Sequence, residues 1–241
     1  MKILDVKGLT KKFKNKEALN NITMNIEEGE IIGLIGPNGA GKTTFIKCIT
    51  GLYKKNTGVV NICEIDIDKD FENAIKNIGV IVESPIMYEH LSGKKNLEVF
   101  SLMNDVKDKE YIKELINLVK LENRLKDKVK TYSLGMKQRL GIVESLLSKP
   151  KLLILDEPTN GLDPNGMIEL RSLIKEINEK YKTTVLISSH NLPEVEHICT
   201  RVVMINNGEM VANLPMEEIR TRNIKLEDVF VVKSNNEEQL R

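Results

Sequence analysis

Residues 31–44 of the chain are Ile-Ile-Gly-Leu-Ile-Gly-Pro-Asn-Gly-Ala-Gly-Lys-Thr-Thr, and this stretch decides the fold. Its first part, Ile31–Ile35, is a continuous apolar run, which is typical of a buried parallel strand. Gly36–Thr43 then fits the pattern GxxxxGK[ST], and the residues from Lys42 to Thr50 predict a helix. A strand, a glycine-rich loop and a helix in this order predict a phosphate-binding loop in an α/β protein.

The residue types of this loop suit the phosphates of a nucleoside triphosphate. Glycines let successive backbone N–H groups turn inward around an anion, and the helix N-terminus adds its positive end. Lys42 supplies a charge for the β- and γ-phosphates, while the Thr43 hydroxyl is a ligand for Mg²⁺, which accepts few protein ligands. We expect the bound nucleotide to contact Gly36, Pro37, Asn38, Gly39, Ala40, Gly41, Lys42, Thr43 and Thr44.

A pair of carboxylates follows a second apolar strand, predicted over Leu152–Leu155. Asp156 and Glu157 come where this strand emerges at its carboxyl end, the edge at which α/β sheets bind ligands. We expect Asp156 to hold Mg²⁺ through water and Glu157 to polarise the attacking water as the general base. Together with the glycine-rich loop, this pair predicts a P-loop NTPase.

Short β-rich runs alternate with helical stretches on both sides of these motifs, as in a parallel sheet with crossover helices. Further strands are predicted over 22–26, 59–62, 78–82, 185–188 and 202–205, and Asn206-Asn207-Gly208 predicts a hairpin turn. From about 83 to 150 the apolar residues recur at helical spacing instead, with one face from Tyr111 to Val119 and another from Leu140 to Leu147. The sequence therefore predicts a helical lobe inserted into an α/β core.

Composition excludes several classes of protein. The 241 residues include 36 Lys and Arg and 35 Asp and Glu, so the net charge is +1 and no nucleic-acid partner is expected. Three scattered cysteines indicate neither a disulfide framework nor a zinc site. The N-terminus has no long apolar segment, and no run approaches the ~18 apolar residues that span a bilayer. We expect a protein that is neither secreted nor itself membrane-spanning.

Segments between and after the two motifs narrow the family. Tyr132-Ser133-Leu134-Gly135-Met136-Lys137-Gln138-Arg139-Leu140 resembles the LSGGQ signature of ATP-binding cassette (ABC) proteins, and Glu157–Pro164 resembles their D-loop, with its Asp163. His190 resembles their switch histidine, and Phe13 stands where such proteins stack an aromatic ring on adenine. Leu91-Ser92-Gly93 also spells three signature letters, but two lysines follow it, so we expect an ordinary turn that leads into a helix.

The resemblance implies a fold and a mechanism for residues 1–241 as one ABC ATPase domain. The fold is α/β: a RecA-like parallel sheet with an antiparallel β subdomain over 1–82 and 150–213, a helical lobe over 83–149 and a C-terminal tail over 214–241. Two chains, copies or paralogues, would pair head to tail. Ser133 and Gly135 of one chain would then face, in trans, the γ-phosphate of the ATP on the other, and His190 would contact the same phosphate.

Two positions depart from the usual ABC pattern. Leu134 stands where most members have glycine, and Glu83 stands where the family usually carries the glutamine that links the catalytic site to the helical lobe. Both departures resemble the cassettes of bacitracin and lantibiotic self-protection exporters. Our hypothesis is that Glu83 ligates Mg²⁺ and acts as the coupling residue. The alternative, a surface loop glutamate, stays open.

The family resemblance also implies partners. A separate membrane permease would dock on the helical lobe near 83–100, which would hold the chain at the inner, cytoplasmic face of the membrane. The function predicted first is ATP hydrolysis that powers export of an antimicrobial peptide or antibiotic. A non-transport ABC ATPase, for example of the cluster-assembly type, is the second reading. A partner that binds ATP without turnover is the third, and intact Lys42, Asp156, Glu157 and His190 argue against it.

The sequence after Ser189 raises two smaller expectations. His197, like the earlier His90, matches no motif, so we expect neither histidine to take part in the chemistry. In the tail, Leu226, Val229 and Phe230 recur at helical spacing, which predicts that they pack back on the core.

Overall fold

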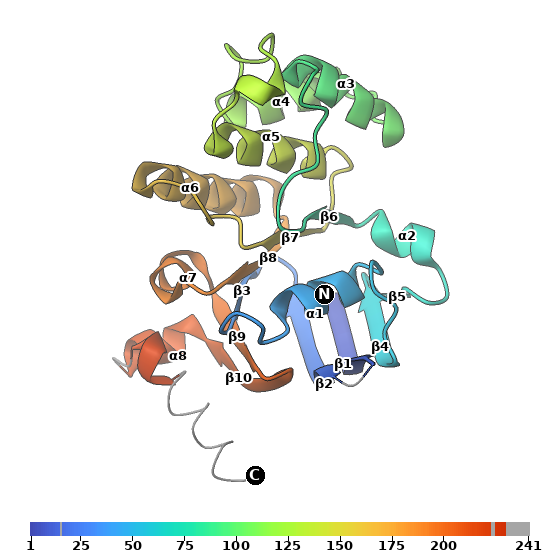
Figure 1. The fold of residues 1–241 in the computed structure, drawn as a ribbon, viewed down its shortest axis with the longest axis vertical. Helices are drawn as coiled ribbons and strands as arrows, with labels where there is room; N and C mark the ends of the chain where they lie inside the picture. The colour runs from blue at the N-terminus through green and yellow to red at the C-terminus, as the bar shows by residue number, and fades with distance from the viewer. Residues whose placement is uncertain (15, 223–224, 230–241) are drawn as a thin grey trace.

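The computed structural model describes residues 1–14, 16–222 and 225–229 (Figure 1). Its elements in chain order are β1 (Lys2–Phe13), β2 (Lys16–Glu27), β3 (Ile31–Ile35), α1 (Lys42–Ile49), β4 (Thr57–Ile62), β5 (Ile65–Asp66), α2 (Phe71–Ile75), β6 (Ile78–Ile81), α3 (Gly93–Met103), α4 (Lys109–Leu118), the 3₁₀ helix η1 (Val129–Thr131), α5 (Leu134–Leu146), β7 (Leu152–Asp156), α6 (Pro164–Tyr181), β8 (Thr184–Ser189), α7 (Leu192–Ile198), β9 (Arg201–Asn206), β10 (Glu209–Pro215) and α8 (Met216–Thr221).

The central sheet contains the two strands that carry the predicted motifs. Its strand order is β10-β9-β3-β8-β7-β6, and every neighbouring pair except β10 with β9 is parallel. The bounds of β3 match the predicted strand, and β7 extends the prediction by Asp156. Because β3, β7 and β8 are parallel neighbours, the segments that follow them meet at one edge of the sheet.

The exception to parallel pairing is the hairpin of β9 and β10, which confirms the turn predicted at residues 206–208. Asn207 and Gly208 both have positive φ, 47° and 80°, as the two central residues of a type I′ turn require. Asn and Gly adopt this conformation more readily than other residues, which explains why the sequence marks the turn.

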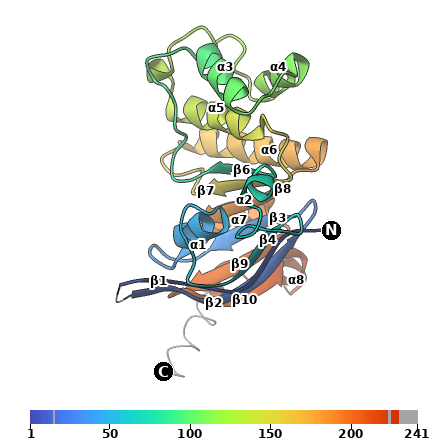
Figure 2. The ribbon, with the colours of Figure 1, turned by 90° about the vertical axis from the view of Figure 1, so that its right-hand side faces the viewer.

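A smaller antiparallel sheet packs below the central one, in the order β2-β1-β4-β5 (Figure 2). Alternate residues of β7 show how the layers form. Leu153 and Leu155 belong to a core cluster shared with the helical lobe, whereas Leu152 and Ile154 belong to one shared with the small sheet and α1. The central sheet is therefore covered on both faces, which accounts for its all-apolar strands.

The segment 83–149 is helical, as the apolar spacing predicts. It contains α3, α4, η1 and α5, at the top of Figure 1, and its only strand-like pairing is the single bridge between Ser92 and Lys128. The predicted faces are buried: one contains Tyr111, Leu115 and Val119, with Ile112 and Leu118 packed beside them, and the other contains Leu140, Val143, Leu146 and Leu147.

The described part of the C-terminal tail returns to the body of the molecule. Leu226 is fully buried, and Val229 packs against the same core cluster. This confirms the expected packing for two of the three predicted residues, while Phe230 lies outside the described residues. Within the described ranges, no helix combines the length and the apolar character needed to cross a membrane.

Candidate active site

A cleft of about 500 Å³ opens where the segments after β3, β7 and β8 meet the hairpin of β1 and β2. It collects residues from four distant parts of the sequence. They are Phe13, Lys16, Ala18, Pro37, Asn38, Gly39, Gly41, Lys42, Thr43, Thr44, Glu157, Asn160 and His190. Most of the predicted ATP-binding and catalytic residues thus line one cleft.

Two glycines allow the loop between β3 and α1 to fold as it does. A Cβ atom on Gly36 would lie 2.2 Å from the backbone oxygen of Ile205, so no larger residue fits. Gly41 caps α1 with φ 115°, and a Cβ there would lie 2.8 Å from the oxygen of Ala18. The loop therefore passes close to neighbouring backbone, and the N-terminus of α1 faces the cleft.

Lys42 lies at the centre of this loop with only 6% of its side chain exposed. Its Nζ donates hydrogen bonds to the oxygens of Gly36 (2.7 Å) and Pro37 (3.3 Å). It also lies 3.2 Å from Oε1 of Glu157. A buried cation held by backbone oxygens at a helix N-terminus is well placed to bind an anion such as a phosphate.

The Glu157 carboxylate contacts both of the other residues predicted to be catalytic, Lys42 and His190. Oε1 faces Lys42, and Oε2 lies 2.7 Å from Nδ1 of His190. Glu157 has φ 49°, a left-handed conformation that is uncommon outside glycine and occurs at functional sites. Lys42, Glu157 and His190 therefore form one contact network although they are far apart in the sequence.

Asp156 and Ser188 hold the base of the site. Asp156 is 1% exposed, and the Ser188 hydroxyl donates to its Oδ1 at 2.5 Å while accepting the backbone N–H of Glu157 at 2.9 Å. The other oxygen, Oδ2, is buried without a hydrogen-bond partner among the described residues. A buried carboxylate oxygen without a partner is the donor type that a hard cation prefers, so the chemistry of Asp156 fits Mg²⁺.

Ser188 was not predicted, and neither were Lys16, Ala18 and Asn160, which line the cleft. Ser188 ends an apolar strand, so a hydroxyl at the carboxyl end of a parallel strand was the available signal. That signal becomes specific only once β8 is known to pair with β7, with Ser188 opposite Asp156.

Phe13 lines the cleft with 40% of its surface exposed. The ring of Tyr53 packs edge-on against it at a centroid distance of 5.4 Å, and Lys11 Nζ lies 4.7 Å from its centroid. An exposed ring held in place by two neighbours can stack on a flat ligand group.

The signature residues lie outside the cleft of their own chain. The Ser133 side chain caps α5 by accepting a hydrogen bond from the N–H of Met136 at 3.2 Å. The Asp163 side chain caps α6 by accepting a hydrogen bond from the N–H of Gly166 at 3.1 Å. The two segments are neighbours, because a Cβ on Gly161 would lie 3.0 Å from the side chain of Leu134. The role of Ser133 and Gly135 in trans stays a prediction.

Glu83 is also absent from the lining of the cleft. Its Oε1 accepts a hydrogen bond from Lys47 Nζ at 2.7 Å, and this bond raises the pKa of Lys47, to which Asp156 adds a smaller effect. Lys47 lies one helical turn after Thr43, so the ion pair brings Glu83 to the side of α1 that carries this predicted Mg²⁺ ligand. Its role as a metal ligand stays a prediction.

The other motif-like residues have ordinary structural roles. Ser92 caps α3, accepting the N–H of Lys95, which confirms that Leu91-Ser92-Gly93 is a turn that leads into a helix. His197 contacts the backbone oxygen of Pro193 one turn earlier, and His90 packs edge-on against Tyr88. Neither histidine lines the cleft.

Comparison with known proteins supports the assignment of this cleft to a nucleotide-binding subunit. A family model described as ABC transporter matches residues 19–160. The chain is 50% identical to the uncharacterized ABC transporter ATP-binding protein YdbJ of Bacillus subtilis, over 89% of this chain and 70% of that protein. It is 43% identical to the lantibiotic transport ATP-binding protein SrtF of Streptococcus pyogenes (87% and 89%) and 39% identical to the bacitracin transport ATP-binding protein BcrA of Bacillus licheniformis (92% and 73%).

Solved structures agree in fold. The ATP-binding subunit of an ABC transporter superposes with a TM-score of 0.84 at 31% identity, over 96% of this chain and 99% of that one. A bacterial ABC transporter cassette, MJ0796, solved as a dimer, superposes with a TM-score of 0.78 at 26% identity, over 88% and 98%. The family match, the relatives and the cleft together show that the chain belongs to the ABC transporter family, as one of its ATP-binding ATPase subunits.

Proposed function

We propose that this subunit powers export of a peptide antibiotic or related antimicrobial compound through a separate membrane permease. The relatives named for lantibiotic and bacitracin transport cover most of the chain, which supports this substrate class. ATP hydrolysis as the activity is supported by the Glu157 carboxylate, which contacts Lys42 and His190 in a cleft lined by the phosphate-binding loop. No such observation favours the non-transport alternative.

The chemistry assigned to each residue follows from its contacts. Thr43 and the free Oδ2 of Asp156 would hold Mg²⁺, which supplies charge neutralisation for the phosphates. Lys42 would transfer its bonds from loop oxygens to the β- and γ-phosphates. Glu157 would accept the proton of the attacking water, while His190 orients the Glu157 carboxylate through Nδ1 and keeps Nε2 available for the γ-phosphate.

A head-to-tail dimer is the proposed working form. Ser133 and Gly135 lie at the N-terminus of α5, outside the cleft of their own chain, where backbone N–H groups could face a phosphate on a second chain. The dimeric cassette structure at 26% identity supports dimerisation.

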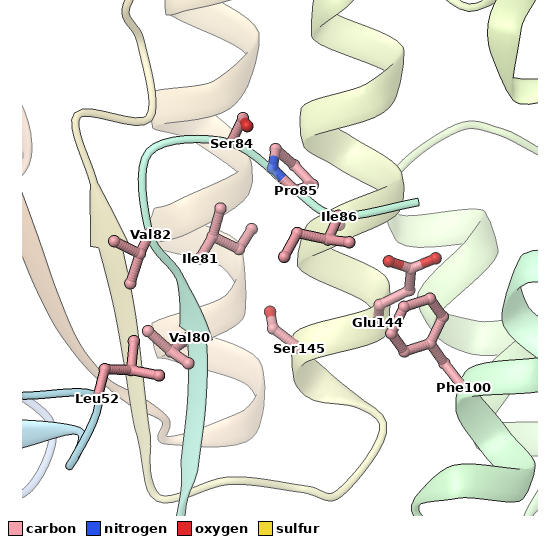
Figure 3. Close-up of a pocket in the computed structure, with 11 residues that line it drawn as sticks. Leu52, Val80, Ile81, Val82, Ser84, Pro85, Ile86, Phe100, Glu144 and Ser145 are labelled. Atoms are coloured by element: carbon pink, nitrogen blue, oxygen red, sulfur yellow. The ribbon is translucent and has the colours of Figure 1, made fainter. Parts of the chain in front are cut away.

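The permease is proposed to bind in a groove between the helical lobe and the core, which we name the docking groove (Figure 3). It has a volume of about 350 Å³ and is lined by Leu52, Val80, Ile81, Val82, Ser84, Pro85, Ile86, Phe100, Gly141, Glu144 and Ser145. Ile86 is 87% exposed and Leu52 is 61% exposed. Exposed apolar side chains around a groove favour a protein partner, and Glu83 directly precedes the Ser84–Ile86 rim.

Recovery of a membrane partner tests this function. A tagged Glu157→Gln chain should bind ATP and hydrolyse it poorly, so it would hold the ATP-bound complex. It would be captured, with ATP, from detergent-solubilised membranes of the organism that carries the gene. We expect a co-purifying multi-span protein, and its loss when Lys42→Ala is added. An ATP-dependent dimer in the absence of any membrane protein would contradict the transporter proposal and favour a non-transport ABC ATPase.

The proposed role of Glu83 is tested by comparing Glu83→Ala with Glu83→Gln and Lys47→Met. In this proposal the Glu83 carboxylate breaks its ion pair with Lys47 and binds Mg²⁺. Glu83→Ala should then lower ATP turnover by about tenfold or more, and Glu83→Gln should keep most of the parental turnover. Lys47→Met removes only the ion pair and should preserve turnover. Unchanged ATPase and unchanged transport-linked resistance in Glu83→Ala would show that Glu83 is an ordinary loop residue.

A further inference from the structure

The docking groove is lined mainly by apolar side chains, together with two serines and one carboxylate. Glu144, on α5, is the only charged residue among the described residues that line it. Figure 3 shows its carboxylate turned toward the side on which Ile86 and Phe100 lie. Carboxylates are rarely placed among apolar side chains, because an ionised group there loses its hydration. The presence of Glu144 at this position therefore calls for a physical reason.

Among the described residues, no hydrogen-bond donor satisfies the buried oxygen of this carboxylate. Oε1 of Glu144 is buried and accepts no hydrogen bond from the described residues. Burial raises the pKa of Glu144 to about 8, and no cation or donor in the described part of the chain opposes this effect. The group is thus destabilised as an anion while it stands alone.

Other carboxylates of the helical lobe differ from Glu144. Glu89 pairs with Lys137, Glu98 with Lys95, and Asp108 with Lys149, and the lobe residue Glu114 pairs with Lys180 of α6. Lysines are therefore available on this surface, and they pair with these four acids. The groove carboxylate alone is left in an apolar setting without one.

We propose that Glu144 pairs with a lysine or arginine side chain on the permease segment that fills the docking groove. The inference rests on the proposed permease partner and adds a chemical requirement to it: the segment is apolar except for one basic residue aimed at α5.

Two general features of proteins support a cation as the occupant. Cytoplasmic loops of membrane proteins carry an excess of Lys and Arg close to the ends of their spans, so a basic side chain is available on the partner's side. An ion pair enclosed by apolar groups is screened little by solvent, and loss of one member leaves the other buried and unpaired. Glu144 would then select the permease segment by charge, while Leu52, Ile86 and Phe100 bind its apolar part.

The discriminating variant is Glu144→Leu, studied in the Glu157→Gln chain with the capture described above. In a groove that binds by apolar contact alone, leucine should keep or improve permease recovery. If Glu144 pairs with a cation, leucine leaves that cation unpaired, and recovery should fall by about tenfold or more. The matched control is Glu179→Leu, on the exposed face of α6, for which permease recovery should stay within about twofold of the parent. Recovery with Glu144→Leu at or above that of the parent would overturn the proposal.

Folding does not confuse this comparison, because removal of a partly buried carboxyl should keep or raise the melting temperature, which is measured for each variant. Failure of the parent chain to recover any membrane protein would count against the permease partner instead. The charge preference of the groove is then measured directly with two synthetic peptides.

The peptides are amphipathic helices of about 15 residues, identical except for a central lysine in one and methionine in the other. Binding to the full chain is followed by fluorescence anisotropy. We expect the lysine peptide to bind the parent about tenfold more tightly than its twin, and this preference to disappear in Glu144→Leu. Equal binding of the two peptides by the parent, or binding of neither, would contradict a cation-selective groove.

Discussion

The Glu157 carboxylate has a neighbour on each oxygen, Lys42 on Oε1 and His190 on Oε2. These contacts fix the plane of the carboxylate, and the left-handed backbone of Glu157 points it into the cleft rather than along the strand. Below it, the Ser188 hydroxyl bonds both Asp156 and the N–H of Glu157. One buried hydroxyl thus positions the proposed metal ligand and the proposed base together.

Substitution Ser188→Ala should therefore lower kcat for ATP hydrolysis by about 10- to 100-fold, since supporting groups around catalytic metal ligands have effects of this size. ATP affinity should change little, because the phosphate-binding loop is untouched. Steady-state kinetics and nucleotide binding measure the two quantities separately. Ser188→Thr, which keeps the hydroxyl, should recover much of the rate, and Ser172→Ala on α6 serves as the control for loss of a hydroxyl. Equal rates for Ser188→Ala and the parent would exclude a positioning role.

Glu144 predicts a pH dependence of stability. Its folded-state pKa is about 8 and its ordinary value is 4.5, so between these values the unfolded chain releases a proton that the folded chain retains. The free energy of unfolding should therefore fall as pH rises through this window. Relative to Glu144→Gln, the parent should lose about 2–4 kcal/mol between pH 5 and pH 9, allowing for partial exposure. Urea denaturation of both proteins at several pH values measures this, and parallel curves would contradict it.

Single site residues could be predicted from the sequence where they belong to a local motif. Lys42, Thr43, Asp156 and Glu157 were predicted because each stands beside a recognisable strand or loop. Ser188 escaped prediction since its importance depends on which strand lies next to β7, a tertiary fact. The ion pair of Glu83 with Lys47 was missed for the same reason.

At the scale of elements, α5 joins three parts of the molecule. Ser133 caps its N-terminus and Gly135 lies in its first turn, its middle packs closely on the segment after β6, and Glu144 lines the docking groove. A Cβ on Gly141 would lie 2.5 Å from Cβ of Pro85, so the helix and this segment are in direct contact. Motion of the 82–86 segment must therefore involve α5 and the groove together.

This close contact predicts opposite effects for two glycines of one helix. Gly141→Ala should lower the free energy of unfolding by about 1–3 kcal/mol, because Pro85 has to move away. Gly135→Ala, where the nearest atom to a Cβ is 3.7 Å away, should leave stability unchanged or raise it by up to ~1 kcal/mol. Denaturant titration of the two variants measures the difference. Equal stabilities would mean that Pro85 gives way freely and that the contact does not link the two elements.

Buried elements were easier to predict than surface ones. The strands β3 and β7 are apolar on both faces, so their bounds are visible in the sequence. By contrast β1 was not predicted, because Lys7, Gly8, Lys11 and Lys12 interrupt its alternation, and its pairing with β2 contains register shifts. Such a strand is defined by its partners rather than by its own pattern.

At the scale of the whole molecule, the cleft and the signature segment are separated within one chain. The cleft is lined from the β1–β2 hairpin, the phosphate-binding loop and the segments after β7 and β8, whereas Ser133 and Gly135 are absent from it. If a second copy supplies them, each site is built from two chains, and two chains related by a two-fold axis form two identical composite sites.

Mixing two inactive variants tests this arrangement. Lys42→Ala removes the phosphate-binding cation from both sites of its homodimer. Gly135→Asp would place a carboxylate opposite the γ-phosphate in both sites of its own homodimer, and the space around Gly135 allows the substitution to fold. In a mixed dimer, one site carries both changes and the other carries neither. Random mixing should therefore restore about a quarter of the parental ATPase activity from two preparations that are each inactive.

The amount restored distinguishes a shared site from a self-contained one. If Ser133 and Gly135 acted on the ATP of their own chain, every site in the mixture would contain one defect and no activity would return. Glu157→Gln mixed with Lys42→Ala is the control, because these two changes fall in the same chain's cleft and should not complement each other. Recovery in the first mixture but not in the second would assign Gly135 to the partner's nucleotide and Lys42 and Glu157 to their own. Recovery in neither mixture would leave the N-terminus of α5 with a structural role only.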